Sequence, residues 1–395
     1  MSEAREVVVL GGVRTAIGDY GGALKDIAPT ELAGQVIREA VKRAKVDPAQ
    51  VNQLVFGNVI HTEAKDMYFS RVACIKGGLP QETTALTVNR LCGSGMQAIV
   101  SAAQSIQLGD ADVTVGGGAE SMSRGGYLMP TLRWGQRMSD SNVVDMMVGA
   151  LTDPFDTVHM GITAENIAEK WKITREQQDA FAVESHRRAL NAIDKGYFKD
   201  QILPVELKTR KGVTLFDRDE HARADISLES LAKLRAVFKK EGSVTAGNAS
   251  GINDGAAAIV MMEKNAAAKA GLKPLARLVS YGLAGVDPKI MGIGPVPACQ
   301  RALAKAGLTV ADMNVIESNE AFAVQALAVS CDLKFDAAKT NPNGGAVGLG
   351  HPIGATGAIL TVKALYELQR TGGRYALVTM CIGGGQGIAA VFERI

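Results

Sequence analysis

The sequence predicts an α/β protein made of two similar halves, with a segment of different character inserted between them. The chain has 395 residues, more than a single hydrophobic core usually holds, so two or three packed units are expected. Strand-like apolar runs alternate with helical patterns towards both ends, which favours sheets covered by helices on both faces. The same order of elements occurs near each end, and this repetition indicates an internal duplication.

The first half begins with a strand-like apolar run at residues 7–10, and apolar residues at helical spacing predict a helix over 36–44. Asp47 and Pro48 then provide an N-cap and a first-turn proline for a short helix. The strand 54–56 follows, before Gly57-Asn58.

The same set of elements recurs near the other end. Residues 301–306 are helical in pattern, Thr309 caps the next turn, and the strand 315–319 ends in an asparagine. Because the order matches that of the first half, we interpret the two sets as copies of one unit.

The repeat extends to a second helix and strand in each half. In the first half a helix is predicted over 96–107, followed by a strand over 113–115 that ends in three glycines. In the second half the matching elements are a helix at about 358–369 and a strand over 375–380, which also ends near three glycines. Two matches in the same order make duplication a better explanation than chance.

The stretch from about 121 to 250 is rich in Met, Arg and Asp, lacks a regular strand–helix rhythm, and is helical in its middle, over 163–193. We therefore expect a first half over residues 1–121, completed by about 251–274, an inserted segment over 122–250, and a second half over 275–395.

Composition excludes several classes of function. Forty-three basic and forty-one acidic residues leave a formal charge of +2, which predicts neither a nucleic-acid nor a membrane partner. No apolar run is long enough for a membrane span. The first residues show no signal peptide and the last no peroxisomal tripeptide, so we expect a cytoplasmic protein. Five widely spaced cysteines without a CxxC pair argue against a disulfide framework or a metal site.

Cys92 is the first candidate for chemistry. It lies in Asn89-Arg90-Leu91-Cys92-Gly93-Ser94-Gly95, at a predicted strand–helix junction. A helix N-terminus exposes unpaired N–H groups, which are expected to stabilise a thiolate, lower the thiol pKa, and serve as an oxyanion hole. The alternative is a buried structural cysteine, the common fate of a free thiol, and this segment alone leaves both open.

His351 precedes a proline in the glycine-framed run 348–357. An imidazole there can act as a base for a thiol or donate to a developing oxyanion. A lone histidine is more often simply hydrogen-bonded, but this one aligns in the duplicated half with the segment around Cys92, which favours function.

Two more polar groups follow strands of the second half. Cys381 precedes Gly383-Gly384-Gly385, and Asn319 ends the strand 315–319. Ligands bind at the carboxyl ends of strands in open α/β sheets, so both are expected at the rim that holds Cys92 and His351. The glycine runs lack the spacing of a phosphate loop or a dinucleotide-binding fingerprint.

These segments resemble the thiolase family. The likeness rests on Asn-Arg-Leu-Cys-Gly-Ser-Gly at 89–95, Asn-Glu-Ala-Phe-Ala at 319–323, Gly-His-Pro-Ile-Gly-Ala at 350–355 and Cys-Ile-Gly-Gly-Gly-Gln-Gly at 381–387. It covers effectively the whole chain and is greatest to the bacterial biosynthetic β-ketothiolases, including those that accept several chain lengths. It implies duplicated βαβαβαββ halves in five layers, α-β-α-β-α, with an inserted loop domain that binds coenzyme A and contributes to oligomerisation. Thr356 stands where serine is more usual, and Gly348 where alanine is.

The resemblance also implies a role for each site residue. Cys92 would become acylated, and His351 would be the base that activates it. Cys381 would remove or return a proton at the α-carbon of acetyl-CoA. Asn319 would hold a water in an oxyanion hole shared with His351, and the N–H groups of Cys92 and Gly383 would form a second hole.

The substrates implied are acetyl-CoA, acyl-CoA and 3-ketoacyl-CoA, and coenzyme A is a substrate, so no cofactor is expected. Arg223 would lie near the nucleotide, and Met291 and Met160 would form an apolar wall of the acyl pocket. The segment 123–140 is too apolar for a free loop, so we expect it to pair subunits of a homotetramer. The positions that resemble coenzyme A contacts are Leu151, His159, Met160, Arg223, Ser230, Ala246, Ser250, Ala321 and Phe322.

Three other functions remain as alternatives. Ketoacyl synthases and hydroxymethylglutaryl-CoA synthases share the superfold but lack a second cysteine followed by three glycines, so Cys381 argues against them. A non-catalytic acyl-CoA-binding protein is disfavoured because all four catalytic-type residues are present. A degradative 3-ketoacyl-CoA thiolase stays open, because the reaction is reversible and its residues are shared.

Overall fold

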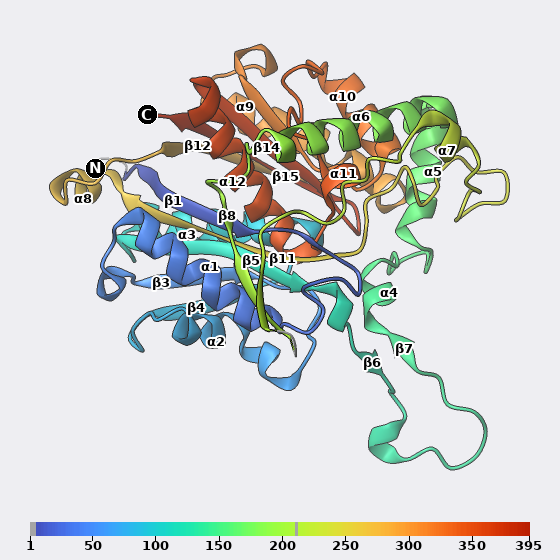
Figure 1. Ribbon diagram of the computed structural model, residues 1–395, viewed down its shortest axis with the longest axis horizontal. Coiled ribbons are helices and arrows are strands. Elements are labelled where there is room, and N and C mark those ends of the chain that lie inside the picture. Colours follow the sequence, from blue (N-terminus) through green and yellow to red (C-terminus); the bar gives the residue numbers. More distant parts are fainter. Residues whose placement is uncertain (1–4, 210–211) are drawn as a thin grey trace.

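The computed structural model describes residues 5–209 and 212–395, and within them the strands of the main sheet form one hydrogen-bonded path (Figure 1). Their order in space is β13-β14-β15-β12-β1-β11-β5-β3-β4. The strands are β1 (Val7–Thr15), β3 (Gln53–Gly57), β4 (Thr84–Val88), β5 (Val113–Ser121), β11 (Asn253–Glu263), β12 (Ala276–Gly285), β13 (Val315–Ser318), β14 (Tyr375–Ile382) and β15 (Gln386–Arg394).

The path consists of two copies of one topology, so the predicted duplication is confirmed. In the first copy β3 pairs in parallel with β5, which pairs antiparallel with β11 and then β1. In the second copy β13 pairs in parallel with β14, which is followed by antiparallel β15 and β12. The copies join where β1 meets β12 at Val8–Arg277 and Val9–Ala276.

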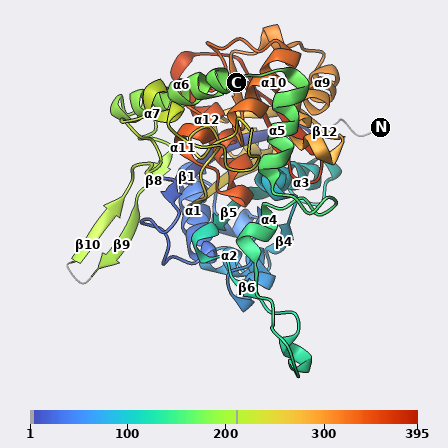
Figure 2. The ribbon, with the colours of Figure 1, turned by 90° about the vertical axis from the view of Figure 1, so that its right-hand side faces the viewer.

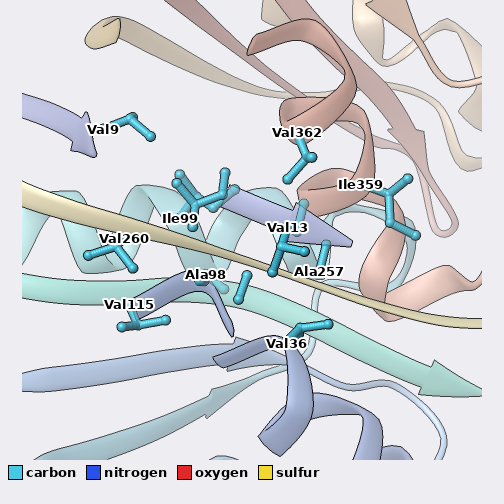
Figure 3. Packing of buried hydrophobic residues seen from close by; sticks show 14 of the residues in the cluster. Val9, Val13, Val36, Ala98, Ile99, Val115, Ala257, Val260, Ile359 and Val362 are labelled. Carbon is cyan, nitrogen blue, oxygen red and sulfur yellow. The ribbon is translucent and has the colours of Figure 1, made fainter. Parts of the chain in front are cut away.

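Helices form three layers around the two copies, and the predicted five-layered arrangement is confirmed. Helices α3 (Ser94–Leu108) and α12 (Ile353–Thr371) pack on each other between the two copies. Helix α3 packs on β3 and β5, and α12 packs on β5, β11 and β14. In Figure 3, Ile359 and Val362 of α12 lie beside Val13 of β1 in this core. The outer layers include α1 (Pro29–Ala44) and α2 (Phe69–Lys76) on one side, and α9 (Pro295–Ala306) and α10 (Ala323–Leu333) on the other.

The inserted segment contains short elements and two hairpins. The helical stretch expected over 163–193 is two helices, because Lys172 adopts a left-handed φ of 55° that ends the first, and Thr174 starts the second with a capping box. Its elements are β6 (Tyr127–Leu128), β7 (Val144–Asp145), α4 (Met146–Ala150), α5 (Met160–Trp171), α6 (Arg175–Asp194), β8 (Ile202–Leu203), β9 (Val205–Thr209), β10 (Gly212–Phe216) and α7 (Leu228–Ala232).

Two parts of the inserted segment project from the body. The excursion between β6 and β7 extends far from the sheets (Figure 1), and the β9–β10 hairpin projects on another side (Figure 2). Among the described residues, no helix has the length and apolarity needed to cross a membrane. The remaining strand and α-helices are β2 (Gly18–Asp19), α8 (Lys264–Lys269) and α11 (Ala346–Leu349).

Candidate active site

Cys92 occupies a single turn, η3 (Leu91–Gly93), immediately before α3. Leu91 has a φ of 43°, a left-handed conformation that is strained for a residue with a side chain. Two side chains hold the turn. Asn89 Oδ1 accepts a hydrogen bond from the Leu91 N–H at 3.0 Å. Ser94 Oγ accepts from the Arg90 N–H at 2.8 Å and donates to the Leu91 carbonyl at 2.7 Å. The strained backbone is therefore fixed by its neighbours, and the thiol keeps one position.

The environment of the Cys92 sulfur combines apolar crowding with two backbone donors. Burial raises the pKa of the thiol to about 11, although hydrogen bonds from the N–H groups of Gly383 and Cys92 itself act to lower it. Glu120 raises it further. The expectation that the helix N-terminus gives a lowered thiol pKa is wrong, because desolvation outweighs the two N–H groups. Cys92 is therefore a neutral thiol at rest.

His351 is held by hydrogen bonds on both ring nitrogens and on its backbone. Its N–H donates to Asn253 Oδ1 at 2.8 Å. Its Nδ1 lies 2.6 Å from Thr356 Oγ1, which itself donates to the Pro352 carbonyl at 2.9 Å. Since the Thr356 proton is already used, Thr356 accepts from Nδ1–H. Nε2 therefore carries no proton, and its lone pair is the acceptor on the other side of the ring.

Asn319 lies next to the unprotonated Nε2 of His351. Its Nδ2 lies 3.4 Å from His351 Nε2, and its Oδ1 is buried without a hydrogen-bond partner among the described residues. A buried amide oxygen of this kind fits a bound water. Burial lowers the pKa of His351 to about 4, so the imidazole is neutral at physiological pH and able to accept a proton.

Cys381 lies at the carboxyl end of β14 and is fully buried. Burial raises the pKa of its thiol well above the usual value, and the nearby Cys92 raises it further. β14 packs against the η3 turn, so the two thiols lie in the same region. Gly383, two residues further on, reaches the wall of the adjoining cavity.

A cavity of about 410 Å³ opens onto these groups. Cys92, His351 and Gly383 lie on its wall, and so does Met291, as predicted. Seven of the nine positions expected to contact coenzyme A also line it: Leu151, His159, Met160, Ala246, Ser250, Ala321 and Phe322. The sequence therefore located most of the cavity, which draws on both halves and on the inserted segment.

Two expected positions do not reach this cavity. Arg223 is exposed and pairs with Asp225 at 2.7 Å. Ser230 lies in α7, where its Oγ accepts from the Ser227 N–H in a capping box and donates to the Ser227 carbonyl.

Phe238 is a cavity residue that sequence reasoning missed. Its ring stacks on His159 with centroids 4.5 Å apart and meets Phe322 edge-on at 6.4 Å. An aromatic residue within the basic run 233–240 was the available clue. Also missed were Leu91, Met122, Ala150, Val237, Thr245, Ala249, Gly251, Ile252 and Ile353, which line the same cavity.

Comparison with known proteins agrees with this geometry. Residues 7–265 match the family model described as thiolase, N-terminal domain, and 272–394 match thiolase, C-terminal domain. The chain is 66% identical over 392 residues to Beta-ketothiolase BktB of Cupriavidus necator, covering 99% of this chain and 100% of that protein. The acetyl-CoA acetyltransferase of Bacillus anthracis superimposes with a TM-score of 0.97 at 48% identity, covering 99% of both chains.

A structure of human mitochondrial 3-ketoacyl-CoA thiolase in complex with CoA is also similar, with a TM-score of 0.96 at 46% identity over 99% of this chain and 98% of that one. The chain belongs to the thiolase family. It is an acyltransferase.

Proposed function

We propose that the chain acts as a β-ketothiolase through an acyl-Cys92 intermediate. The thiolase reaction joins acetyl-CoA to an acyl-CoA, or cleaves a 3-ketoacyl-CoA with free CoA. The observation that carries the assignment of Cys92 is that the N–H groups of Cys92 and Gly383 both meet its sulfur at the cavity wall. These donors are in place to stabilise the oxyanion of a thioester under attack.

The first step transfers the acyl group. Cys92 Sγ attacks the thioester carbonyl while its proton passes to His351 Nε2 and stays there, and the departing CoA thiolate takes the proton of the Cys381 thiol, which leaves Cys381 as a thiolate. One thioester replaces another, so the step costs little and divides a difficult reaction into two easier ones. With a thiol pKa near 11 and an imidazole pKa near 4, the charged pair is disfavoured at rest. Proton transfer is therefore expected to accompany the attack on the carbonyl.

The second step forms the carbon–carbon bond. The Cys381 thiolate removes a proton from the α-carbon of acetyl-CoA, and the enolate attacks the acyl group on Cys92. The bond from the acyl carbon to Cys92 Sγ then breaks, and the released Cys92 thiolate takes its proton back from His351. Charge on the enolate oxygen is met by His351 together with a water held by Asn319, whose Oδ1 is buried without a described partner. Loss of one such donor typically costs a factor of about a hundred to a thousand in rate.

Coenzyme A would enter along the inserted segment. The apolar cavity suits the acyl group and the pantetheine arm, and Arg223, exposed beyond it, suits the phosphates at the nucleotide end. The human relative was solved in complex with CoA, which supports CoA as a ligand. Physiological direction stays open between synthesis and degradation, and the homotetramer and cytoplasmic location remain predictions.

The decisive experiment separates the two cysteines. Incubation with acetyl-CoA alone should add one acetyl group to a peptide containing Cys92, and Cys92→Ala should abolish it. Cys381→Ala should still be acylated, because Cys92 and His351 carry out the attack on the thioester and the departing CoA thiolate can take a proton from water instead. That variant should fail at condensation and at exchange of acetyl-CoA methyl protons with deuterated solvent. Acylation on Cys381, with exchange surviving its removal, would reverse the two assignments.

A further inference from the structure

Glu120 is a fully buried carboxylate near the carboxyl end of β5, and the mechanism above does not use it. It forms no ion pair among the described residues, and its partners are N–H donors. Four of them converge on its two oxygens: Asn58 Nδ2 at 3.1 Å, the Val59 N–H at 3.1 Å, the Ile60 N–H at 3.0 Å and the Gly354 N–H at 2.8 Å. A buried carboxylate satisfied in this way is an anchor for the backbone that surrounds it.

The donors come from both halves of the molecule. Residues 58–60 follow β3 in the first half, and Gly354 lies in the first turn of α12 in the second, three residues after His351. The Asn58 N–H also donates to the Val88 carbonyl at 3.3 Å, at the end of the strand that leads to the Cys92 turn. One carboxylate therefore connects the approach to the nucleophile with the helix that follows the base.

Packing places this anchor directly beneath the cavity. Val59, Ile60, Cys92 and Ile353 belong to one apolar cluster, so the segments held by Glu120 are also the ones that pack around the nucleophile. Small residues bring the backbones close here, since a Cβ on Gly57 would lie 2.8 Å from the Gly354 carbonyl oxygen. A shift of either segment would move the other.

Electrostatics shows that Glu120 does not assist the thiolate directly. Burial raises the pKa of its carboxyl to about 8, so the group is largely protonated at neutral pH, and once it is ionised its charge raises the pKa of the Cys92 thiol. A negative charge that opposes the reactive form of the nucleophile contributes to the reaction only by holding geometry.

We propose that Glu120 is a positioning residue that fixes the Cys92 turn relative to the start of α12 and so sets the alignment of Cys92 with His351. The inference rests on the proposed function of that pair. Glu120 touches no reacting atom and acts through the backbone of residues 58–60 and Gly354.

The test compares Glu120→Gln with Glu263→Gln. Glutamine keeps the shape of the side chain but turns one acceptor into a donor that faces the N–H groups. Glu263 is also buried and accepts from the Ala266 N–H at 2.8 Å, but it stands at the end of β11 opposite the site. Folding is monitored by circular dichroism and thermal unfolding. Glu120→Gln should lower kcat at least tenfold per acylatable Cys92 with the KM for acetyl-CoA within about threefold, and Glu263→Gln should leave both unchanged.

A second measurement follows the alkylation of Cys92 by iodoacetamide against pH. Removal of the carboxyl should shift the profile of Glu120→Gln to lower pH. Glu120→Asp separates this charge effect from an opening of the site, because it keeps the carboxyl and withdraws it by one methylene, whereas a defect that exposes the thiol would shift both profiles. An unchanged kcat in folded Glu120→Gln would overturn the proposal. If Glu120→Gln does not fold, Glu120→Asp decides, and wild-type kcat in that variant would refute the anchor. Failure of Cys92 to be acylated in the wild type would instead refute the proposed function. The alkylation profile would still report the effect of Glu120 on the Cys92 thiol, because it does not depend on acylation.

Discussion

Thr356 Oγ1 lies 2.6 Å from His351 Nδ1 and gives its own proton to the Pro352 carbonyl, so it fixes which nitrogen of the imidazole is free. Thr356→Val keeps the shape but removes the acceptor, which leaves Nδ1–H unsatisfied and the ring free to change tautomer. We expect kcat to fall roughly tenfold or more, a part of what a general base contributes. Steady-state thiolysis and condensation rates check this. Thr356→Ser, which retains the hydroxyl, should stay close to wild type, and equal losses in both variants would contradict the tautomer role.

The contribution of His351 to the stability of the protein should fall as the pH falls from about 6.5 to about 4. Burial lowers the pKa of His351 to about 4, so over that range the unfolded chain binds a proton that the folded one does not. This stabilisation is fully present above the pKa of histidine in the unfolded chain and is lost as the pH falls to the pKa of His351 in the folded protein. A shift of this size corresponds to about 3 kcal/mol. His186, with a pKa lowered to about 4, acts in the same direction. Denaturant unfolding at a series of pH values measures this contribution. The difference in free energy of unfolding between the wild type and His351→Gln should change as the pH falls, to the disadvantage of the wild type, and a constant difference would be evidence against the buried neutral imidazole.

Met291 should influence the length of the acyl chain. It is buried and lines the cavity with Met160, and methionine adapts to irregular space. Met291→Phe should narrow the cavity and lower kcat/KM for longer 3-ketoacyl-CoAs roughly tenfold relative to the shortest, in line with the cost of a methylene or two in an apolar pocket. A rate profile over increasing chain length measures it, with the exposed Met67→Phe as control. An unchanged profile would mean that Met291 does not bound the acyl group.

The projecting excursion between β6 and β7 should mediate assembly. Trp134 is 88% exposed and Met138 87% exposed, and apolar side chains gathered on an extension usually mark an interface. The wild type should be a tetramer by light scattering at micromolar concentration, and Trp134→Ser with Met138→Ser should reduce its size without loss of fold. Leu108→Ser, exposed at the end of α3, is the matched control. A stable wild-type monomer would refute this role.

Much of the fold was accessible from the sequence because its repeats are local patterns. Spacing of apolar residues located the cores of α3, α12 and β14, and each is longer in the structure at one or both ends. The helical stretch over 163–193 was harder, because the break at Lys172 depends on a left-handed residue other than glycine. Backbone conformation of that kind leaves no clear mark on composition.

The site was predictable where a motif carries it and not where distant segments meet. Cys92, His351 and Asn319 stand in distinctive short runs, and the structure brings all three together. The thiol pKa was misjudged because burial depends on the surrounding chain, whereas the helix N-terminus is visible locally. Phe238 and Glu120 were missed for the same reason, since their partners lie at least 60 residues away in sequence.

The glycine contact between α3 and α12 has a consequence for how the enzyme moves. At Gly95 a Cβ would lie 3.0 Å from the Gly354 carbonyl oxygen and 2.8 Å from the Ala358 nitrogen, so the catalytic helices meet backbone to backbone. Backbone has no rotamers to exchange, so this contact offers few soft degrees of freedom. The reorganisation energy at the thiol and imidazole is accordingly small. The opposite wall of the cavity is more adaptable, because the long side chains of Met160 and Met291 can change rotamer when substrate enters.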